Sequence, residues 1–224
     1  MQNIKRENVS IILWLFSGCF LIFTMVIVGG ITRLTGSGLS MVDWNLFMGV
    51  VPPLNYQEWM EAFNQYKEYP EYQERNYMFS LTDFKKIFFW EYIHRVLGRF
   101  IGLVFIIPYL YFIIRKRFTK KLLFQTSVLL ILGSLQGFFG WWMVKSGLVD
   151  RPDVSHLRLA THLITAFLTF SFTFCAKWTC SYHLPLTDIV WAPPIQLPKQ
   201  YKTQSWLYCC QKMFRALQSR ISCF

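Results

Sequence analysis

Apolar residues gather into four long blocks along the chain, and three of these blocks contain no charged residue. A helix needs about 20 apolar residues to cross the ~30 Å hydrocarbon core of a bilayer. Each block reaches this length, the last one with the help of the amphipathic Lys177 and Trp178 at its end. The pattern predicts an all-α integral membrane protein whose four transmembrane helices form one bundle. The predicted spans are residues 11–30, 87–114, 122–144 and 158–178.

The composition agrees with a membrane location and argues against a disordered chain. Of the 224 residues, 54% are hydrophobic and only 16% are charged. The net charge of +11 would favour a nucleic-acid partner in a soluble protein, but in a membrane protein it indicates orientation. We therefore expect a lipid bilayer around the chain and no nucleic acid.

The distribution of basic residues predicts which side of the membrane each segment faces. Residues 115–121 hold five Lys or Arg and no acid, so this short connection is expected on the inner side. The segment 31–86 then lies outside, and its seven acidic residues outnumber its five basic ones. An amino-terminal arm, residues 1–10, and a polar tail, residues 183–224, are both expected on the inner side.

The outer segment 31–86 is too long to be a simple connection. Residues 56–63 have apolar positions three and four apart, which predicts a surface helix. The residues from Ser80 to Asp83 are typical of a second helix start, and that helix could continue into the second span. We interpret the tyrosines of this segment as an aromatic belt at the membrane interface rather than as a ligand lid. They are Tyr66, Tyr69, Tyr72 and Tyr77.

Two histidines lie inside the predicted spans at matched depth. Counting about 20 residues back from the inner end of each span places His94 and His162 in the outer half of the bilayer. Ionisable residues at such depths are costly and usually face the interior of a bundle. Six-coordinate heme iron requires two axial imidazoles, because the porphyrin supplies the four equatorial nitrogens. Either histidine alone is more simply a hydrogen-bonded packing residue, but the matched pair favours heme binding.

Other charged residues surround this pair in the sequence. Glu91 precedes His94 by three residues and shares its helical face, so its carboxylate could orient the imidazole, bind a substrate or pass a proton. The alternative for Glu91 is an ion pair with Arg95. Three arginines gather toward the outer surface and suit the two propionates of a heme. They are Arg33, Arg95 and Arg99.

Small residues in the spans predict places of close approach. Gly98 and Gly102, and likewise Gly133 and Gly137, have the GxxxG spacing that lets helices or a flat macrocycle come close. Plain helix packing is the simpler interpretation of both pairs. Gln136 of the third span is interpreted as an interhelical hydrogen-bonding residue.

Four ordered segments resemble the heme A synthase family, most closely its mitochondrial branch. They are residues 28–40 at the end of the first span, 90–95 in the second, 136–148 closing the third and 158–163 in the fourth. The resemblance covers about residues 3–180. It implies that His94 and His162 are axial ligands of heme iron and that Glu91 is a functionally important carboxylate.

The resemblance also implies an activity and its surroundings. Family members are oxidoreductases that convert the C8 methyl group of heme O to the formyl group of heme A, which cytochrome c oxidase needs. They consist of two four-helix bundles, eight helices in all, and the sequence resembles the amino-terminal one. Heme O is then the expected substrate, heme b belongs to the second bundle, and an electron donor such as a ferredoxin is implied.

The same resemblance predicts a multi-pass protein of the mitochondrial inner membrane with both termini in the matrix. Its expected protein partners are a second copy of the chain or a full-length synthase. Two other functions stay open at this point: a non-catalytic b-type heme protein with two histidine ligands, and an assembly factor that binds heme. The activity of one bundle by itself is not implied by the resemblance.

Overall fold

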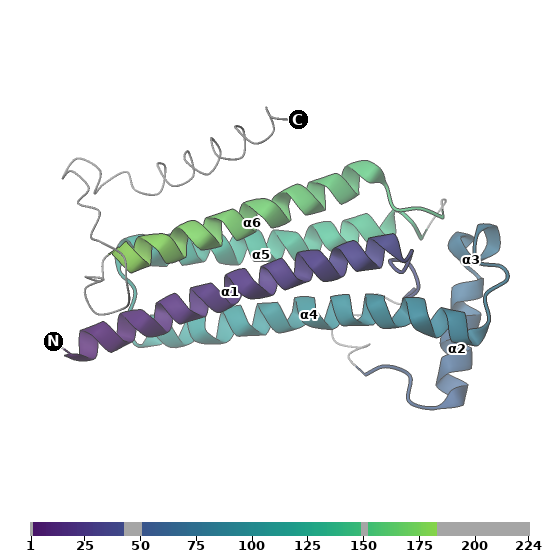
Figure 1. Ribbon diagram of the computed structural model, residues 1–224, viewed down its shortest axis with the longest axis horizontal. Coiled ribbons are helices and arrows are strands. Elements are labelled where there is room, and N and C mark those ends of the chain that lie inside the picture. Colours follow the sequence, from purple (N-terminus) through teal and green to yellow (C-terminus); the bar gives the residue numbers. More distant parts are fainter. Residues whose placement is uncertain (1, 43–50, 149–151, 183–224) are drawn as a thin grey trace, which may run out of the picture. The chain divides into compact units, whose positions relative to one another are not determined.

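The computed structural model describes residues 2–42, 51–148 and 152–182, and this part of the chain is built of α-helices without a β-strand. The long helices are α1 (Gln2–Leu34), α4 (Leu81–Ile114), α5 (Lys120–Lys145) and α6 (His156–Tyr182). Along the chain, the short helices α2 (Tyr56–Lys67) and α3 (Pro70–Glu74) follow α1 and precede α4 (Figure 1). The expected inner tail, residues 183–224, lies outside the described residues.

Each long helix contains a stretch that is long and apolar enough to cross a membrane. These stretches are Val9–Leu34, Leu81–Ile114, Lys120–Lys145 and His156–Lys177. The predicted all-α membrane fold with four spanning helices is therefore confirmed. The fourth long helix begins two residues before the predicted span 158–178. Its first residue is His156, which is exposed.

Helix α4 begins well before the predicted second span. The Ser80 hydroxyl donates a hydrogen bond to Asp83 Oδ2 over 2.7 Å, and the Asp83 amide donates to Ser80 Oγ over 3.3 Å. This reciprocal cap satisfies free groups of the first turn, as the sequence of this turn predicted. The helix has 34 residues, or roughly 51 Å at 1.5 Å per residue, so it is much longer than the hydrocarbon core is thick.

The described residues pack as two compact units, each containing parts of all four long helices. Unit 1 contains residues 2–20, 105–131 and 168–182. Its core is centred on Trp14, whose ring centroid lies 5.0 Å from that of Phe105 and 5.6 Å from that of Phe112. The Tyr109 hydroxyl is 2.9 Å from Ser127 Oγ, so this buried polar group is paired.

Unit 2 contains residues 21–42, 51–104, 132–148 and 152–167, and it carries α2 and α3 on the first turns of α4 (Figure 1). Asn55 caps α2 by accepting a hydrogen bond from the Glu58 amide over 2.8 Å, and α2 confirms the predicted surface helix. Its apolar face packs on α4, where Phe84 is completely buried. The other buried residues of this cluster are Met41, Phe63, Tyr66, Ile87 and Phe88.

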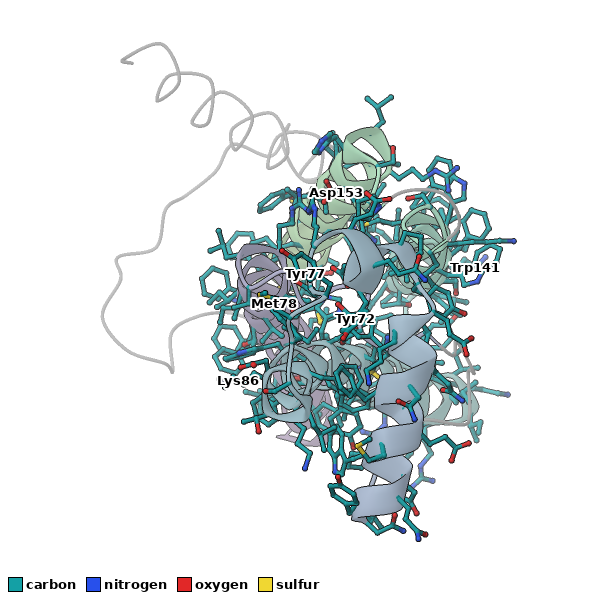
Figure 2. The ribbon with its side chains drawn as sticks, turned by 90° about the vertical axis from the view of Figure 1, so that its right-hand side faces the viewer. Tyr72, Tyr77, Met78, Lys86, Trp141 and Asp153 are labelled. Atoms are coloured by element: carbon teal, nitrogen blue, oxygen red, sulfur yellow. The ribbon has the colours of Figure 1, made fainter. Side chains whose placement is uncertain are left out.

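The interpretation of the outer tyrosines as an interface belt is wrong for Tyr66. Its side chain is 0% exposed and its ring lies 5.2 Å from that of Phe84, because α2 turns this face toward α4. Tyr72 joins the same cluster, with its ring 5.8 Å from that of Phe63, and Tyr77 is exposed. Figure 2 looks onto this end of unit 2 and labels Tyr72 and Tyr77.

Candidate functional site

His94 of α4 and His162 of α6 both belong to unit 2. Each imidazole lies against a glycine of another helix. A Cβ atom on Gly29 of α1 would lie 3.3 Å from His94 Nε2, and a Cβ atom on Gly140 of α5 would lie 3.3 Å from His162 Cε1. The missing side chains of these two glycines therefore make room for the two rings.

The glycines that the spacing rule selected behave differently. A Cβ on Gly98 would meet only Met25 Cε, at 3.4 Å, and around Gly102, Gly133 and Gly137 no heavy atom lies within 4 Å of such a Cβ. The expected close helix approach at the last three positions is therefore absent. A GxxxG search could not find Gly29 and Gly140, because their importance depends on the histidine that faces them from another helix. Both do fall inside the segments that resemble heme A synthase.

The backbone of His162 is held by α5, but one nitrogen of its ring has no hydrogen-bond partner in the described part of the chain. Gln136 Nε2 donates to the His162 carbonyl oxygen over 3.2 Å, which confirms the predicted interhelical hydrogen bond. The Thr165 hydroxyl lies 3.3 Å from Gln136 Oε1 and 3.0 Å from the same carbonyl oxygen. The buried Nδ1 atom of His162 has no hydrogen-bond partner among the described residues. Such an atom is costly in a finished core and fits a ring that takes part in binding a group outside the polypeptide.

Glu91 is 3% exposed, and all its observed partners come from α4 and from the chain just after α1. Its Oε2 atom accepts the Ser40 amide and the Ser40 hydroxyl, both over 2.7 Å, and the Met41 amide over 2.9 Å. Its Oε1 atom pairs with Arg95 Nη2 at 2.5 Å. Arg95 also donates to the Met41 carbonyl oxygen over 2.8 Å. The ion-pair alternative for Glu91 is thus confirmed.

Residues 37–41, which we call the 37–41 strap, connect the end of α1 to two other parts of unit 2. Gly36 precedes the strap with a φ of 63°, the left-handed conformation that commonly ends a helix. Inside the strap, Leu39 is 3% and Ser40 is 1% exposed. Leu39 lies so close to Gly147, just after α5, that a Cβ there would be 2.8 Å from Leu39 Cδ1. Two of the four segments that resemble heme A synthase thus meet at this contact.

The three candidate arginines have different surroundings. Arg95 is bound to Glu91 and to the strap, as described above. Arg33 is exposed in the last turn of α1, and Arg99 is partly buried one turn after Arg95 on α4. Propionate binding by these three residues stays a prediction.

A second buried carboxyl group, Glu71, lies on α3, and no sequence pattern predicted its burial. Glu71 is 7% exposed and accepts a hydrogen bond from the Tyr66 hydroxyl over 3.0 Å, and this hydroxyl accepts one from Asn76 Nδ2 over 2.7 Å. Burial raises the pKa of Glu71 from 4.5 to about 7, and the negative charges of Glu91 and Asp153 add to this. The Tyr66 hydrogen bond and the positive charge of Arg75 oppose the rise.

The connection between α5 and α6 is tied to α3 by an ion pair. Arg75 Nη1 donates to Asp153 Oδ1 over 2.7 Å, and Arg75 Nη2 donates to Asp153 Oδ2 over 2.5 Å. Both side chains are more than one third exposed, so this bidentate pair contributes little stability by itself.

The donor set of unit 2 limits the kind of metal group that it suits. No cluster of three or more His, Cys, Asp or Glu side chains that could hold a bare metal ion occurs in the part of the chain that the structure describes. Two imidazoles on separate helices instead suit an iron that brings its own four equatorial ligands. Heme is such a group.

Comparison with known proteins agrees with this chemistry. The family model COX15-CtaA, described as cytochrome oxidase assembly protein, matches residues 12–211. The chain belongs to this family. Heme A synthase of Flavobacterium psychrophilum is 56% identical over 170 residues, which are 75% of this chain and 50% of that protein. Heme A synthase of Agrobacterium fabrum is 47% identical over 185 residues, which are 83% of this chain and 51% of that protein.

The chain spans about half the length of the curated relatives that it matches. These relatives are bacterial, so the comparisons do not support the mitochondrial branch. No solved structure matches the chain. Family membership and the four apolar helices make the chain a multi-pass membrane protein.

Proposed function

We propose that this chain is the amino-terminal half of a heme A synthase and that it binds heme O as substrate between His94 and His162. The observation that carries the proposal is the pair of imidazoles in unit 2, each seated against a glycine of another helix. The buried Nδ1 of His162 supports it, because this nitrogen has no partner among the described side chains. The printed names of the relatives give the reaction class.

In the proposed reaction, the C8 methyl group of heme O would be hydroxylated twice, each time with one oxygen atom from an external oxidant, and the resulting diol would lose one water to give the formyl group of heme A. The bound heme supplies the redox chemistry of its iron, and the protein supplies binding and orientation. His94 and His162 hold the iron, and the glycines beside them let both rings approach. Glu91 is the proposed carboxylate of the reaction, and Arg33, Arg95 and Arg99 are the proposed contacts of the propionates.

The proposed reaction also needs components that this chain does not contain. Heme b in a second bundle and an electron donor such as a ferredoxin are part of the proposal for the whole enzyme. Because one histidine pair binds one heme, we expect the chain expressed alone to bind heme and to form little heme A. We propose that the chain obtains the missing heme site by associating with a second copy of itself or with a full-length synthase.

The proposed orientation places both ends of the chain on the inner side. It is supported by the five basic residues between α4 and α5, against no acid there. The inner side is the cytoplasm in a bacterium and the matrix in a mitochondrion, and the mitochondrial inner membrane stays a prediction of the sequence. A tag inserted after Lys116 should resist protease added from outside, and a tag at Gln73 should be cleaved. The reverse pattern would overturn the orientation.

One chemical argument favours a second function. Two axial histidines leave heme iron no open position for oxygen, and this is typical of b-type electron-transfer proteins. The alternative is therefore a non-catalytic heme protein or an assembly factor.

The test is co-expression with a source of heme O in cells that lack any other heme A synthase. Chromatography of the extracted hemes is compared for this chain and for the chain extended by the second half of a relative. Heme A from the extended chain supports the synthase, and bound heme without heme A in both supports the alternative. His94→Ala and His162→Ala should each change the low-spin heme spectrum, whereas His156→Ala is the matched control, because His156 is exposed. An unchanged spectrum in both site variants would overturn the ligand assignment.

A further inference from the structure

We propose that the 37–41 strap is a positioning element for the two histidines and that Glu91 acts through it. The proposed positioning residues are Ser40 and Leu39 of the strap, together with Gly147, which Leu39 contacts. The link to heme rests on the proposed function, whereas the strap itself is defined by contacts that involve no ligand.

The first anchor of the strap is Glu91. Three of the four observed hydrogen bonds to its carboxylate come from Ser40 and Met41, over 2.7 to 2.9 Å. The fourth comes from Arg95, which itself donates to the Met41 carbonyl oxygen. Oε2 of Glu91 therefore holds the strap, while Oε1 pairs with Arg95.

The second anchor is the contact between Leu39 and Gly147. Any side chain on Gly147 would overlap Leu39, since a Cβ would lie 2.8 Å and 2.9 Å from its two methyl carbons. Leu39 is 3% exposed, so the contact lies inside unit 2. The absence of a side chain at residue 147 therefore lets the strap reach the end of α5.

These anchors connect the elements that seat the histidines. Glu91 lies less than one turn before His94 on α4, and the strap continues α1, whose Gly29 lies against the His94 ring. Gly147 follows α5, whose Gly140 lies against the His162 ring. One short segment thus joins the elements around His94 to the helix behind His162. A strap that shifts changes the separation of the two imidazoles, and binding of a metal group is sensitive to such supporting contacts.

Hydrogen exchange of the full chain in detergent tests the strap without any ligand. In Glu91→Ala, the backbone amides of Ser40 and Met41 should exchange about tenfold faster or more, because their buried acceptor is removed. Glu61→Ala is the control, since Glu61 is exposed on α2. Unchanged exchange at both amides in Glu91→Ala would overturn the first anchor.

Heme titration then tests whether the strap positions the histidines. Gly147→Ala touches neither histidine, yet we expect heme affinity to fall about tenfold and the low-spin spectrum to weaken. The double variant Gly147→Ala with Leu39→Val should recover part of both, because the shorter side chain relieves the overlap with residue 39, while the new Cβ still lies 3.3 Å from the Asp153 carbonyl carbon. Gly30→Ala on α1 is the control, since Gly30 is exposed and its Cβ would meet no heavy atom of the described residues within 4 Å. Glu91→Gln should retain more affinity than Glu91→Ala, because an amide oxygen can still accept from the strap.

The outcomes separate this inference from the proposed function. If the strap amides exchange faster while heme affinity and spectrum stay unchanged, the positioning role is overturned and the proposed function stands. If Gly147→Ala loses affinity and Leu39→Val restores none of it, the Leu39 anchor is overturned. If the unaltered chain binds no heme, the proposed function is overturned, and hydrogen exchange still decides whether Glu91 holds the strap.

Discussion

Replacing Glu71 by glutamine should make the part of unit 2 that contains α2 and α3 less sensitive to pH. The pKa of this carboxyl group is raised from 4.5 to about 7, chiefly by burial. Below pH 4.5 both the folded and the unfolded chain carry the proton, so burial costs nothing through titration. As the pH rises from 4.5 to 7, the unfolded chain loses the proton first, and the folded state becomes progressively less stable.

The magnitude follows from the size of this shift. One pKa unit corresponds to about 1.4 kcal/mol, so the full cost of ionising Glu71 in the folded state is roughly 3 kcal/mol above pH 7. Glutamine has the same shape and can still accept the Tyr66 hydroxyl, but it cannot ionise. Glu71→Gln should therefore stabilise α2 and α3 by about 3 kcal/mol at pH 8 and by less than about 1 kcal/mol at pH 5.

Hydrogen exchange of the α2 and α3 amides at both pH values measures this difference. A stabilisation of about 3 kcal/mol corresponds to more than about 100-fold slower exchange at pH 8. Glu74→Gln is the matched control, because Glu74 is exposed at the end of the same short helix. The reasoning fails if Glu71→Gln and the unaltered chain show the same dependence on pH, or if Glu74→Gln reproduces the effect.

Two further predictions concern packing. Gly140→Ala should push the His162 ring by a few tenths of an ångström and change the spectrum of bound heme, because the new Cβ would lie 3.3 Å from the ring. Gly30→Ala should leave the spectrum unchanged, because Gly30 is exposed and its Cβ would meet no heavy atom of the described residues within 4 Å, and an equal change in both variants would contradict this. Trp14→Ala should lower the stability of unit 1 by about 3–5 kcal/mol, because this buried ring touches three others. Thermal unfolding in detergent checks it against Phe16→Ala, whose side chain is 57% exposed and should cost far less.

The fold was predictable because membrane spans depend on local properties of the chain. Uninterrupted apolar length predicted α1, α5 and α6, and the helix start at Ser80 predicted the early beginning of α4. The two histidines were found in the same way, since an ionisable residue at membrane depth stands out from its neighbours.

The contacts around the site depend on residues far apart in the sequence, and no local pattern contains them. Glu91 lies 51 residues from Ser40, and neither shows its partner in the sequence. Gly140 gains its role only from the ring that faces it. Tyr66 belongs to a polar segment, and its complete burial could not be predicted without knowing that Phe84 of α4 packs against it.

The anchors of the 37–41 strap also imply an order of assembly during synthesis. When α1 has entered the membrane, the amides of Ser40 and Met41 still lack their acceptor, because Glu91 is made about fifty residues later. The contact with Gly147 requires α5 as well. Both anchors are therefore available once residue 147 has been translated, so the strap can be in place before α6 brings His162 to unit 2.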